Sequence, residues 1–232
     1  MKKRSRELRA VHAIVPVNVL SKSKVRLSPI LSPNERQELS VAMLKDVLSA
    51  LRKARQIRQI TIVSADKSAR VIARRFGTAF LWEGKRRGLN KGIKLAVRSA
   101  GRKGAVGVLV IHADLPLLKA REIDRFVERS RGYSVALTPS KDGSGTNALL
   151  MNPPEVFKPV FGTDSFRRHL YLAHQRNLRI RVLRFNGVGF DIDQPQDLVQ
   201  LARRPLRNET GRFLRTLRKG VRSRGGNTSK GI

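Results

Sequence analysis

The sequence predicts an α/β protein built on a mostly parallel, mixed sheet. Short runs rich in Val, Ile and Leu alternate along the chain with amphipathic segments of helical periodicity, which is the pattern of repeated βαβ units. Later in the chain the predicted strands follow one another more closely, and this spacing favours some antiparallel pairing. With 232 residues the chain is long enough to bury one sizeable core, so we expect one main domain.

The first half of the chain carries alternating strand and helix signals. Strands are expected at residues 11–17, 59–64, 79–82 and 106–111. Asp66 is expected to cap a helix that carries Val71, Ile72 and Phe76, and another helix is expected at residues 89–100. A longer helix begins at Ser32-Pro33-Asn34-Glu35, and its apolar positions lie at helical spacing, namely Leu39, Met43, Leu44, Val47, Leu48 and Leu51.

The second half is expected to continue this alternation. Helices are expected at residues 120–129, 164–175 and 195–203, and strands at residues 133–138, 146–151 and 180–185. The composition then becomes rich in Arg, Lys and Gly. We therefore divide the chain into a main domain over residues 1–204 and a basic, flexible C-terminal tail over residues 205–232. Within that tail, one amphipathic helix could form on Leu206, Phe213, Leu214 and Leu217.

The chain is strongly basic, with 49 Lys and Arg against 17 Asp and Glu and a net charge of +32. Such a field attracts polyanions, so a basic nucleic-acid-binding α/β protein is one alternative. The charge is spread along the chain, however, and aromatic residues make up only 5% of it, too few to suggest base-stacking platforms. We interpret nonspecific polyanion binding as a side activity of the tail.

Other classes of protein are excluded by composition. Without cysteine the chain cannot form disulfides, zinc-thiolate sites or a thiol nucleophile. The apolar stretch from Val11 to Leu20 is interrupted by polar residues, and no segment approaches the ~20 apolar residues of a membrane span. We expect a cytoplasmic protein that does not enter a membrane.

Three aspartates lie where a metal site is expected. Asp114 follows a buried strand, and Asp191 and Asp193 are spaced i and i+2 in Gly189-Phe190-Asp191-Ile192-Asp193. A carboxylate just beyond a parallel strand lies at the ligand-binding edge of an open sheet, and side chains at i and i+2 in an extended segment share one side. Oxygen ligands of this kind suit Mg²⁺. A turn before Pro116 and a helix cap by Asp193 are the structural alternatives.

Four loops at the same edge could bind phosphates. Lys24 and Arg26 belong to a basic loop after the first strand, which could neutralise a triphosphate or simply be solvated. The others combine glycines with hydroxyl or amide side chains: Gly88-Leu89-Asn90, Gly143-Ser144-Gly145-Thr146-Asn147, and Gly162-Thr163-Asp164-Ser165. Two of them open helices, whose N-termini favour anions. Thr163 or Asp164 could instead be an ordinary helix cap.

Taken in order, these motifs resemble the 2-phospho-L-lactate guanylyltransferase family of coenzyme F-420 biosynthesis, whose bacterial relatives use phosphoenolpyruvate. The resemblance covers residues 12 to 202 and includes Lys24-x-Arg26-Leu27-Ser28, Ala113-Asp114-Leu115-Pro116-Leu117, Ser165-Phe166-x-x-His169 and Asp191-Ile192-Asp193-x-Pro195-x-Asp197-Leu198. It implies a three-layer nucleotidyltransferase fold, similar to that of molybdenum-cofactor guanylyltransferases, and a homodimer.

The resemblance also implies roles for individual residues. Asp114, Asp191 and Asp193 would bind Mg²⁺, and the phosphorylated acid would contact Thr146, Gly162 and Ser165. We expect Lys24 and Arg26 to act on the triphosphate of GTP, with Asp114 as the third catalytic residue, and Gly88 and Asn90 to fix the nucleoside.

The chemistry is compatible with a site poor in histidine. A phosphate monoester is largely a dianion near neutral pH, so its oxygen can attack the α-phosphorus of GTP without a strong general base. The partner substrate could be 2-phospho-L-lactate, phosphoenolpyruvate or another three-carbon phosphate. A sugar-phosphate nucleotidyltransferase shares the expected fold and metal ligands and remains a further alternative.

Overall fold

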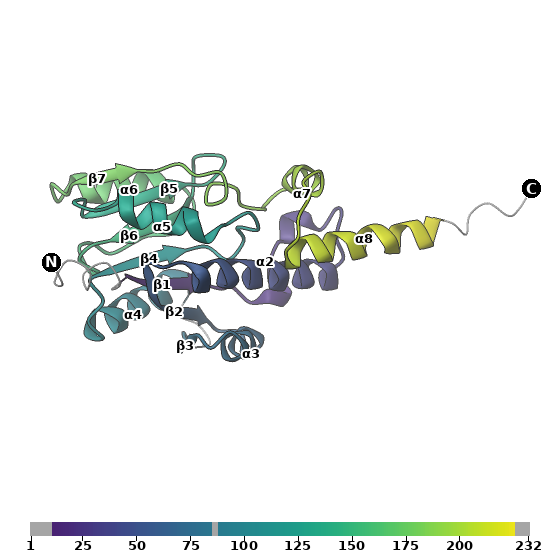
Figure 1. Cartoon of the computed structure of the whole chain (residues 1–232), viewed down its shortest axis with the longest axis horizontal. Coiled ribbons are helices and arrows are strands. Elements are labelled where there is room, and N and C mark those ends of the chain that lie inside the picture. Colours follow the sequence, from purple (N-terminus) through teal and green to yellow (C-terminus); the bar gives the residue numbers. More distant parts are fainter. Residues whose placement is uncertain (1–10, 85–87, 226–232) are drawn as a thin grey trace, which may run out of the picture.

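A computed structural model describes residues 11–84 and 88–225, and the strands in these ranges form one seven-stranded sheet with the order β3-β2-β1-β4-β6-β5-β7 (Figure 1). Strand β6 is antiparallel to both of its neighbours, whereas the other pairs are parallel. The mostly parallel mixed sheet predicted from the sequence is therefore confirmed. The strands are β1 Val11–Pro16, β2 Ile57–Ser64, β3 Ala79–Trp82, β4 Gly107–Ile111, β5 Val135–Pro139, β6 Thr146–Met151 and β7 Ile180–Val182.

Helices connect most of these strands. Helix α2 begins at the predicted signature, where Ser32 and Glu35 form a capping box, and Asp66 caps α3 as expected by accepting from the Ser68 N–H. Among the described residues, no helix combines the length and apolar character that a membrane crossing requires. The helices are α2 Pro33–Lys53, α3 Lys67–Arg75, α4 Leu89–Arg102, α5 Ala120–Arg129, α6 Ser165–His174, α7 Pro195–Ala202 and α8 Glu209–Gly225, and two 3-10 turns span Leu20–Lys22 (η1) and Val25–Leu27 (η2).

The sheet is covered on both faces, which gives the three layers. Along β1, Ala13 and Val15 pack in a core with residues of α2, α3 and α5, while Ile14 packs in a second core with residues of α4 and α6. Successive side chains of a strand point to opposite faces, so a continuously apolar strand such as β1 can supply both cores.

Helix α8 lies within the segment expected to be a tail, residues 205–232, and its first turns contact α2. Its Leu214 is buried, and the Asp46 carboxylate of α2 accepts hydrogen bonds from the backbone N–H groups of Glu209 and Thr210 and from the Thr210 hydroxyl. Figure 1 shows α8 running beside α2 and extending beyond it. The amphipathic helix is therefore present, and its first turns belong to the packed body. Residues 226–232, where a flexible end is expected, lie outside the described residues.

The topology brings several chain segments to one edge of the sheet. Strands β1 and β4 are parallel and end there, at Pro16 and Ile111. Because β6 runs the opposite way, it begins at the same edge, with Ala148 opposite Ile111. Residues just after β1 and β4 and at the start of β6 therefore meet, and these are the segments with the predicted site residues.

Candidate active site

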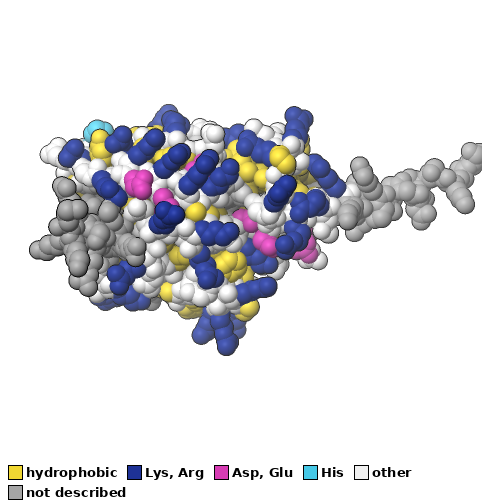
Figure 2. Space-filling view, viewed as in Figure 1, with side chains coloured by type: hydrophobic (Ala, Val, Ile, Leu, Met, Phe, Trp, Pro, Cys, Tyr) yellow, Lys and Arg dark blue, Asp and Glu magenta, His cyan; other side chains and the backbone are white. Residues whose placement is uncertain are grey.

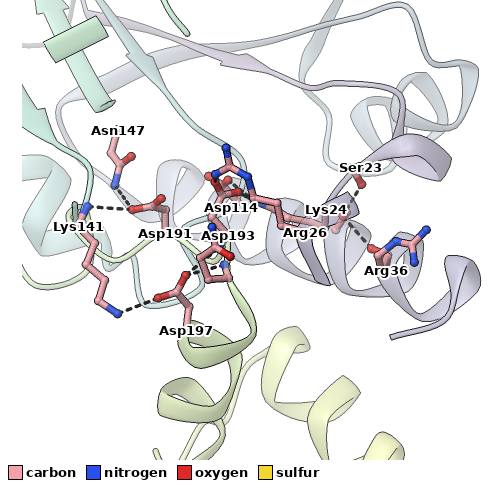
Figure 3. Close-up of polar contacts among 12 residues, drawn as sticks. Ser23, Lys24, Arg26, Arg36, Asp114, Lys141, Asn147, Asp191, Asp193 and Asp197 are labelled. Carbon is pink, nitrogen blue, oxygen red and sulfur yellow. Dashed lines mark hydrogen bonds and ion pairs between the residues drawn. The ribbon is translucent and has the colours of Figure 1, made fainter. Parts of the chain in front are cut away.

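The centre of this edge is a lysine held between two aspartates from distant parts of the chain (Figure 3). Lys24 Nζ lies 2.5 Å from Asp114 Oδ2 and 3.2 Å from Asp193 Oδ1. Arg26 Nη1 adds a contact of 2.8 Å to Asp193 Oδ2. The structure thus brings together four of the predicted residues, two cations and two carboxylates.

The charges in this cluster stabilise one another. Burial of Lys24 acts to lower its pKa, but the carboxylates of Asp114 and Asp193 outweigh burial and raise it. Burial acts to raise the pKa of Asp114, and the Lys24 ammonium outweighs it and holds the pKa low. Both groups are therefore charged at neutral pH.

The backbone of Lys24 is unusual as well. It adopts φ 54° and ψ 39°, in the left-handed region that non-glycine residues rarely occupy. This conformation costs roughly 1–2 kcal/mol. Lys24 immediately precedes η2, and its side chain is only 9% exposed because it points into the cluster. The strained backbone therefore accompanies an inward-pointing ammonium.

Asp191 is directed elsewhere. Its Oδ1 accepts hydrogen bonds from the Lys141 backbone N–H and from Asn147 Nδ2, at 3.1 and 3.0 Å, so it links the loop after β5 to the start of β6 (Figure 3). Among the described residues, no three His, Cys, Asp or Glu side chains lie close enough together to hold a metal ion. Asp114 and Asp193 converge on one point, and Asp191 does not join them.

Two observations nevertheless fit a divalent cation near Asp114. Its Oδ1 is buried and has no hydrogen-bond partner among the described residues, while its Oδ2 and Asp193 already converge on a positive group. An unpaired buried carboxylate oxygen is costly, and carboxylate oxygens are the ligands that Mg²⁺ prefers. The carboxylate oxygens of Asp114 and Asp193 are therefore ligands of the kind that the predicted magnesium ion requires.

Asp197, which the sequence did not single out for a role, positions Asp193. Its Oδ2 accepts from the backbone N–H groups of Asp193 and Gln194, and its Oδ1 accepts from Lys141 Nζ at 2.7 Å. Gln194 is the N-cap of α7, so the alternative of Asp193 as the helix cap is wrong. The sequence does contain a pattern that predicts this cap: α7 begins with proline and has a carboxylate at its third position.

The residues predicted to bind the acid lie at a second part of the edge. Thr146 and Ser165 are buried, with 0% and 2% of their surfaces exposed. Gly162 adopts φ 119°, and Asp164 at the N-cap of α6 makes no side-chain capping hydrogen bond. The Thr146 hydroxyl lies 2.9 Å from Nδ1 of His169, to which the sequence assigned no role.

Asn90 links the two predicted substrate loops. Its Nδ2 donates to the Phe161 carbonyl at 3.0 Å, and its Oδ1 accepts from the Phe161 N–H at 2.7 Å. The N-cap Gly88, with φ 74°, begins the same helix. Asn90, which was predicted to bind the nucleoside, therefore anchors the loop that was predicted to bind the acid. The two residues are 71 positions apart, so no local sequence pattern indicates the contact.

Comparison with known proteins relates this chain to guanylyl transferases. The family model described as guanylyl transferase CofC like matches residues 11–231. The phosphoenolpyruvate guanylyltransferase of Sphaerobacter thermophilus is 43% identical over 191 residues, which cover 82% of this chain and 91% of that protein. The 2-phospho-L-lactate guanylyltransferase of Methanobrevibacter smithii is 32% identical over 213 residues, covering 92% and 93%.

A solved structure supports the fold. A nucleotidyl transferase from Methanothermobacter thermautotrophicus has a TM-score of 0.64 and 15% identity, covering 90% of this chain and 99% of that one. The three-layer nucleotidyltransferase fold predicted from the sequence is thereby confirmed. The match of the family model over all described residues, together with relatives above 30% identity, shows that this chain belongs to the CofC-like family of guanylyl transferases.

Proposed function

We propose that this protein joins GTP to a three-carbon phosphorylated acid, 2-phospho-L-lactate or phosphoenolpyruvate, with release of pyrophosphate. The observation that carries the proposal is the cluster of Lys24, Arg26, Asp114 and Asp193 at the sheet edge. Alternating cations and carboxylates suit a reaction between two polyanions, whose repulsion and alignment make up most of the barrier. The activities for which the related proteins are named support the same reaction.

Lys24 and Arg26 would bind the triphosphate and the leaving pyrophosphate. Arg26 is well placed for this role because its side chain is 66% exposed and can turn toward a ligand. Lys24 is already charged and buried, so it can exchange a carboxylate for a phosphate without a change of protonation. We assign the nucleoside to the loop that contains Gly88 and Asn90.

Asp114, Asp193 and Asp191 would hold Mg²⁺. When bound, the ion would neutralise phosphate charge and help align the two substrates. Asp114 and Asp193 already contact the same positive group, the ammonium of Lys24. Asp191 would have to leave its contacts with Lys141 and Asn147 to join them at the ion.

Thr146, Gly162 and Ser165 would contact the acid. Hydroxyl and backbone donors suit a small anion and add no further charge. Since Thr146 and Ser165 are buried, the acid reaches their hydroxyls only after the residues that cover them have moved. The phosphate oxygen of the acid would then attack the α-phosphorus of GTP, and the bond to the pyrophosphate oxygen would break.

The same proposal places the protein in coenzyme F-420 biosynthesis, in the cytoplasm and as a homodimer. The surface is strongly basic, and Figure 2 shows Lys and Arg side chains distributed over the visible face. That distribution supports nonspecific polyanion binding as a side activity, with the C-terminal residues as one contributor.

An activity screen tests the proposal. GTP, ATP, CTP and UTP are each combined with 2-phospho-L-lactate, phosphoenolpyruvate and a set of sugar 1-phosphates in the presence of Mg²⁺, and pyrophosphate release is measured. We expect release with GTP and at least one of the two acids. Release only with sugar phosphates would support the sugar-phosphate nucleotidyltransferase alternative instead.

A further inference from the structure

His169 of α6 is buried with both ring nitrogens in hydrogen bonds. Its exposed fraction is 0%, and its ring packs edge-on against Phe161, with 4.9 Å between the ring centroids. Nε2 lies 3.0 Å from the backbone nitrogen of Val160, and Nδ1 lies 2.9 Å from the Thr146 hydroxyl. The ring thus connects the start of β6 to the loop that leads to Gly162.

These contacts determine which nitrogen carries the proton. A backbone N–H can only donate, so Nε2 must accept the hydrogen bond from Val160 with its lone pair. A neutral imidazole then has its proton on Nδ1. Burial, with a smaller contribution from His112, lowers the pKa of His169 to about 4, which agrees with a neutral ring at physiological pH.

The tautomer in turn determines the role of the Thr146 hydroxyl. Because Nδ1–H donates, the Thr146 oxygen accepts, and the hydrogen of the hydroxyl is left for another partner. In the described part of the chain, Thr146 Oγ1 has no second hydrogen-bond partner. A buried hydroxyl that offers its hydrogen is suited to an anionic oxygen and poorly suited to a ligand that itself donates.

We propose that His169 is a positioning residue for the acid substrate: it holds Thr146 as a hydrogen-bond donor toward the acid and fixes the loop at Val160. This inference rests on the proposed function, because it takes Thr146 to contact the acid. It adds a reason for selectivity, since the site would prefer a small anion over a neutral ligand of similar size.

A purely structural role for His169 makes different predictions. If the ring only fastened α6 to the loop, its contact with Val160 would matter and the identity of the group facing Thr146 would not. The two contacts can be separated with amide side chains. An asparagine at this position places its amide nitrogen where Nδ1 lies, and a glutamine can place its amide oxygen where Nε2 lies.

The experiment compares His169→Gln with His169→Asn in the full-length protein with Mg²⁺, GTP and phosphoenolpyruvate or 2-phospho-L-lactate. His169→Gln keeps an acceptor for Val160 and loses the donor to Thr146. We expect it to raise the KM for the acid by about 10- to 100-fold, as when a hydrogen bond to a charged group is lost, with a much smaller change for GTP. His169→Asn keeps the donor and should show a KM for the acid closer to that of the unmodified protein.

A double-mutant cycle makes the test specific. In a Thr146→Val background, His169→Gln should raise the KM for the acid no further, because the hydroxyl through which it acts is absent. An equal increase in both backgrounds, or parallel increases in the KM for GTP and for the acid, would overturn the positioning role.

One measurement does not depend on whether the variants fold. In the unmodified protein, the ¹⁵N chemical shifts of the His169 ring report its tautomer directly, and we expect the proton on Nδ1. A proton on Nε2 would contradict the inference. Failure of the proposed function is distinguishable, because the unmodified protein would then show no turnover of either acid while the tautomer could still be as inferred.

Discussion

Lys24 and Asp114 form an ion pair of 2.5 Å between residues 90 positions apart, and the Lys24 side chain is only 9% exposed. The pair joins the loop after β1 to the end of β4, so it fixes the geometry of the sheet edge as well as its charge. Removing Lys24 leaves the Asp114 carboxylate without its cation away from bulk water, whereas removing Asp114 leaves Lys24 with the longer contact to Asp193.

Replacement of Lys24 therefore affects both stability and catalysis. We expect Lys24→Met to lower the free energy of unfolding by on the order of 2 kcal/mol, because Asp114 is left unpaired. It should also raise the KM for GTP. Chemical denaturation of Lys24→Met, Asp114→Asn and the double variant gives the coupling. If the two residues interact, the double variant should lose less unfolding free energy than the two single variants together. A loss equal to that sum would contradict the pairing.

The carboxylates are expected to contribute mainly to turnover. Asp114→Asn or Asp193→Asn should lower kcat by about 10²–10³-fold while the protein stays folded. Chelation of divalent ions should abolish activity, and Mg²⁺ should restore it. Turnover close to that of the unmodified protein in both variants at saturating Mg²⁺ would remove the metal assignment.

Acidification should destabilise the protein through His169. Its folded-state pKa, about 4, lies below the ordinary value of 6.5, so between these pH values the unfolded chain binds a proton that the folded chain does not. Stability is therefore lost as the pH falls from 6.5 toward 4, by up to about 3 kcal/mol from this group. Unfolding free energies measured over this range should fall less steeply for His169→Gln. Identical slopes would show that other groups cause the loss.

Helix α8 depends on Asp46. The carboxylate accepts three hydrogen bonds from Glu209 and Thr210, so Asp46→Ala should lower the free energy of unfolding by about 1–3 kcal/mol. Thr210→Val removes one of these bonds and should cost less. Equal losses in the two variants would mean that the backbone contacts contribute nothing.

The polyanion hypothesis is tested by truncation after Arg218, which keeps Leu214 and Thr210 in place. The deletion removes Lys219, Arg222, Arg224 and Lys230. If these cations bind nucleic acid, the plot of log binding constant against log salt concentration should become less steep, with a slope smaller in magnitude by about 3 to 4 for duplex DNA. The rate of guanylyl transfer should not change. Binding that persists undiminished would instead favour the body of the protein as a nucleic-acid surface. Truncation at residue 204 would be uninformative, since it also removes the packed turns of α8.

The sequence predicted those features that depend on local patterns. The apolar runs at β1 and β4 and the capping residues Ser32 and Asp66 mark their elements because periodicity and helix caps are local. The strand β7 ends at Val182 rather than at the expected residue 185. Strand boundaries depend on pairing partners, and β7 pairs only with β5 among the described strands.

The arrangement of the site could be predicted only in part. Placement of Lys24 and Asp114 at one sheet edge follows from the alternation of strands and helices, because both residues follow parallel strands. Thr146 joins them only because β6 runs antiparallel to β4, so that its first residue lies at the edge where β4 ends. Asn90 forms hydrogen bonds with Phe161, which is 71 positions away, and Asp46 with Thr210, which is 164 positions away. No local sequence pattern predicts such contacts. The same holds for the direction of Asp191, which depends on where the loop after β5 lies.

The central claim is that the cluster around Lys24 transfers a guanylyl group to a phosphorylated three-carbon acid. The most direct measurement is the identity of the product when the protein is incubated with GTP, Mg²⁺ and 2-phospho-L-lactate or phosphoenolpyruvate. We predict a diphosphate linkage between GMP and the acid in the ³¹P spectrum, with the matching mass and one pyrophosphate per product. GTP left intact with both acids, or cleaved to GDP and phosphate without a linked product, would contradict the claim.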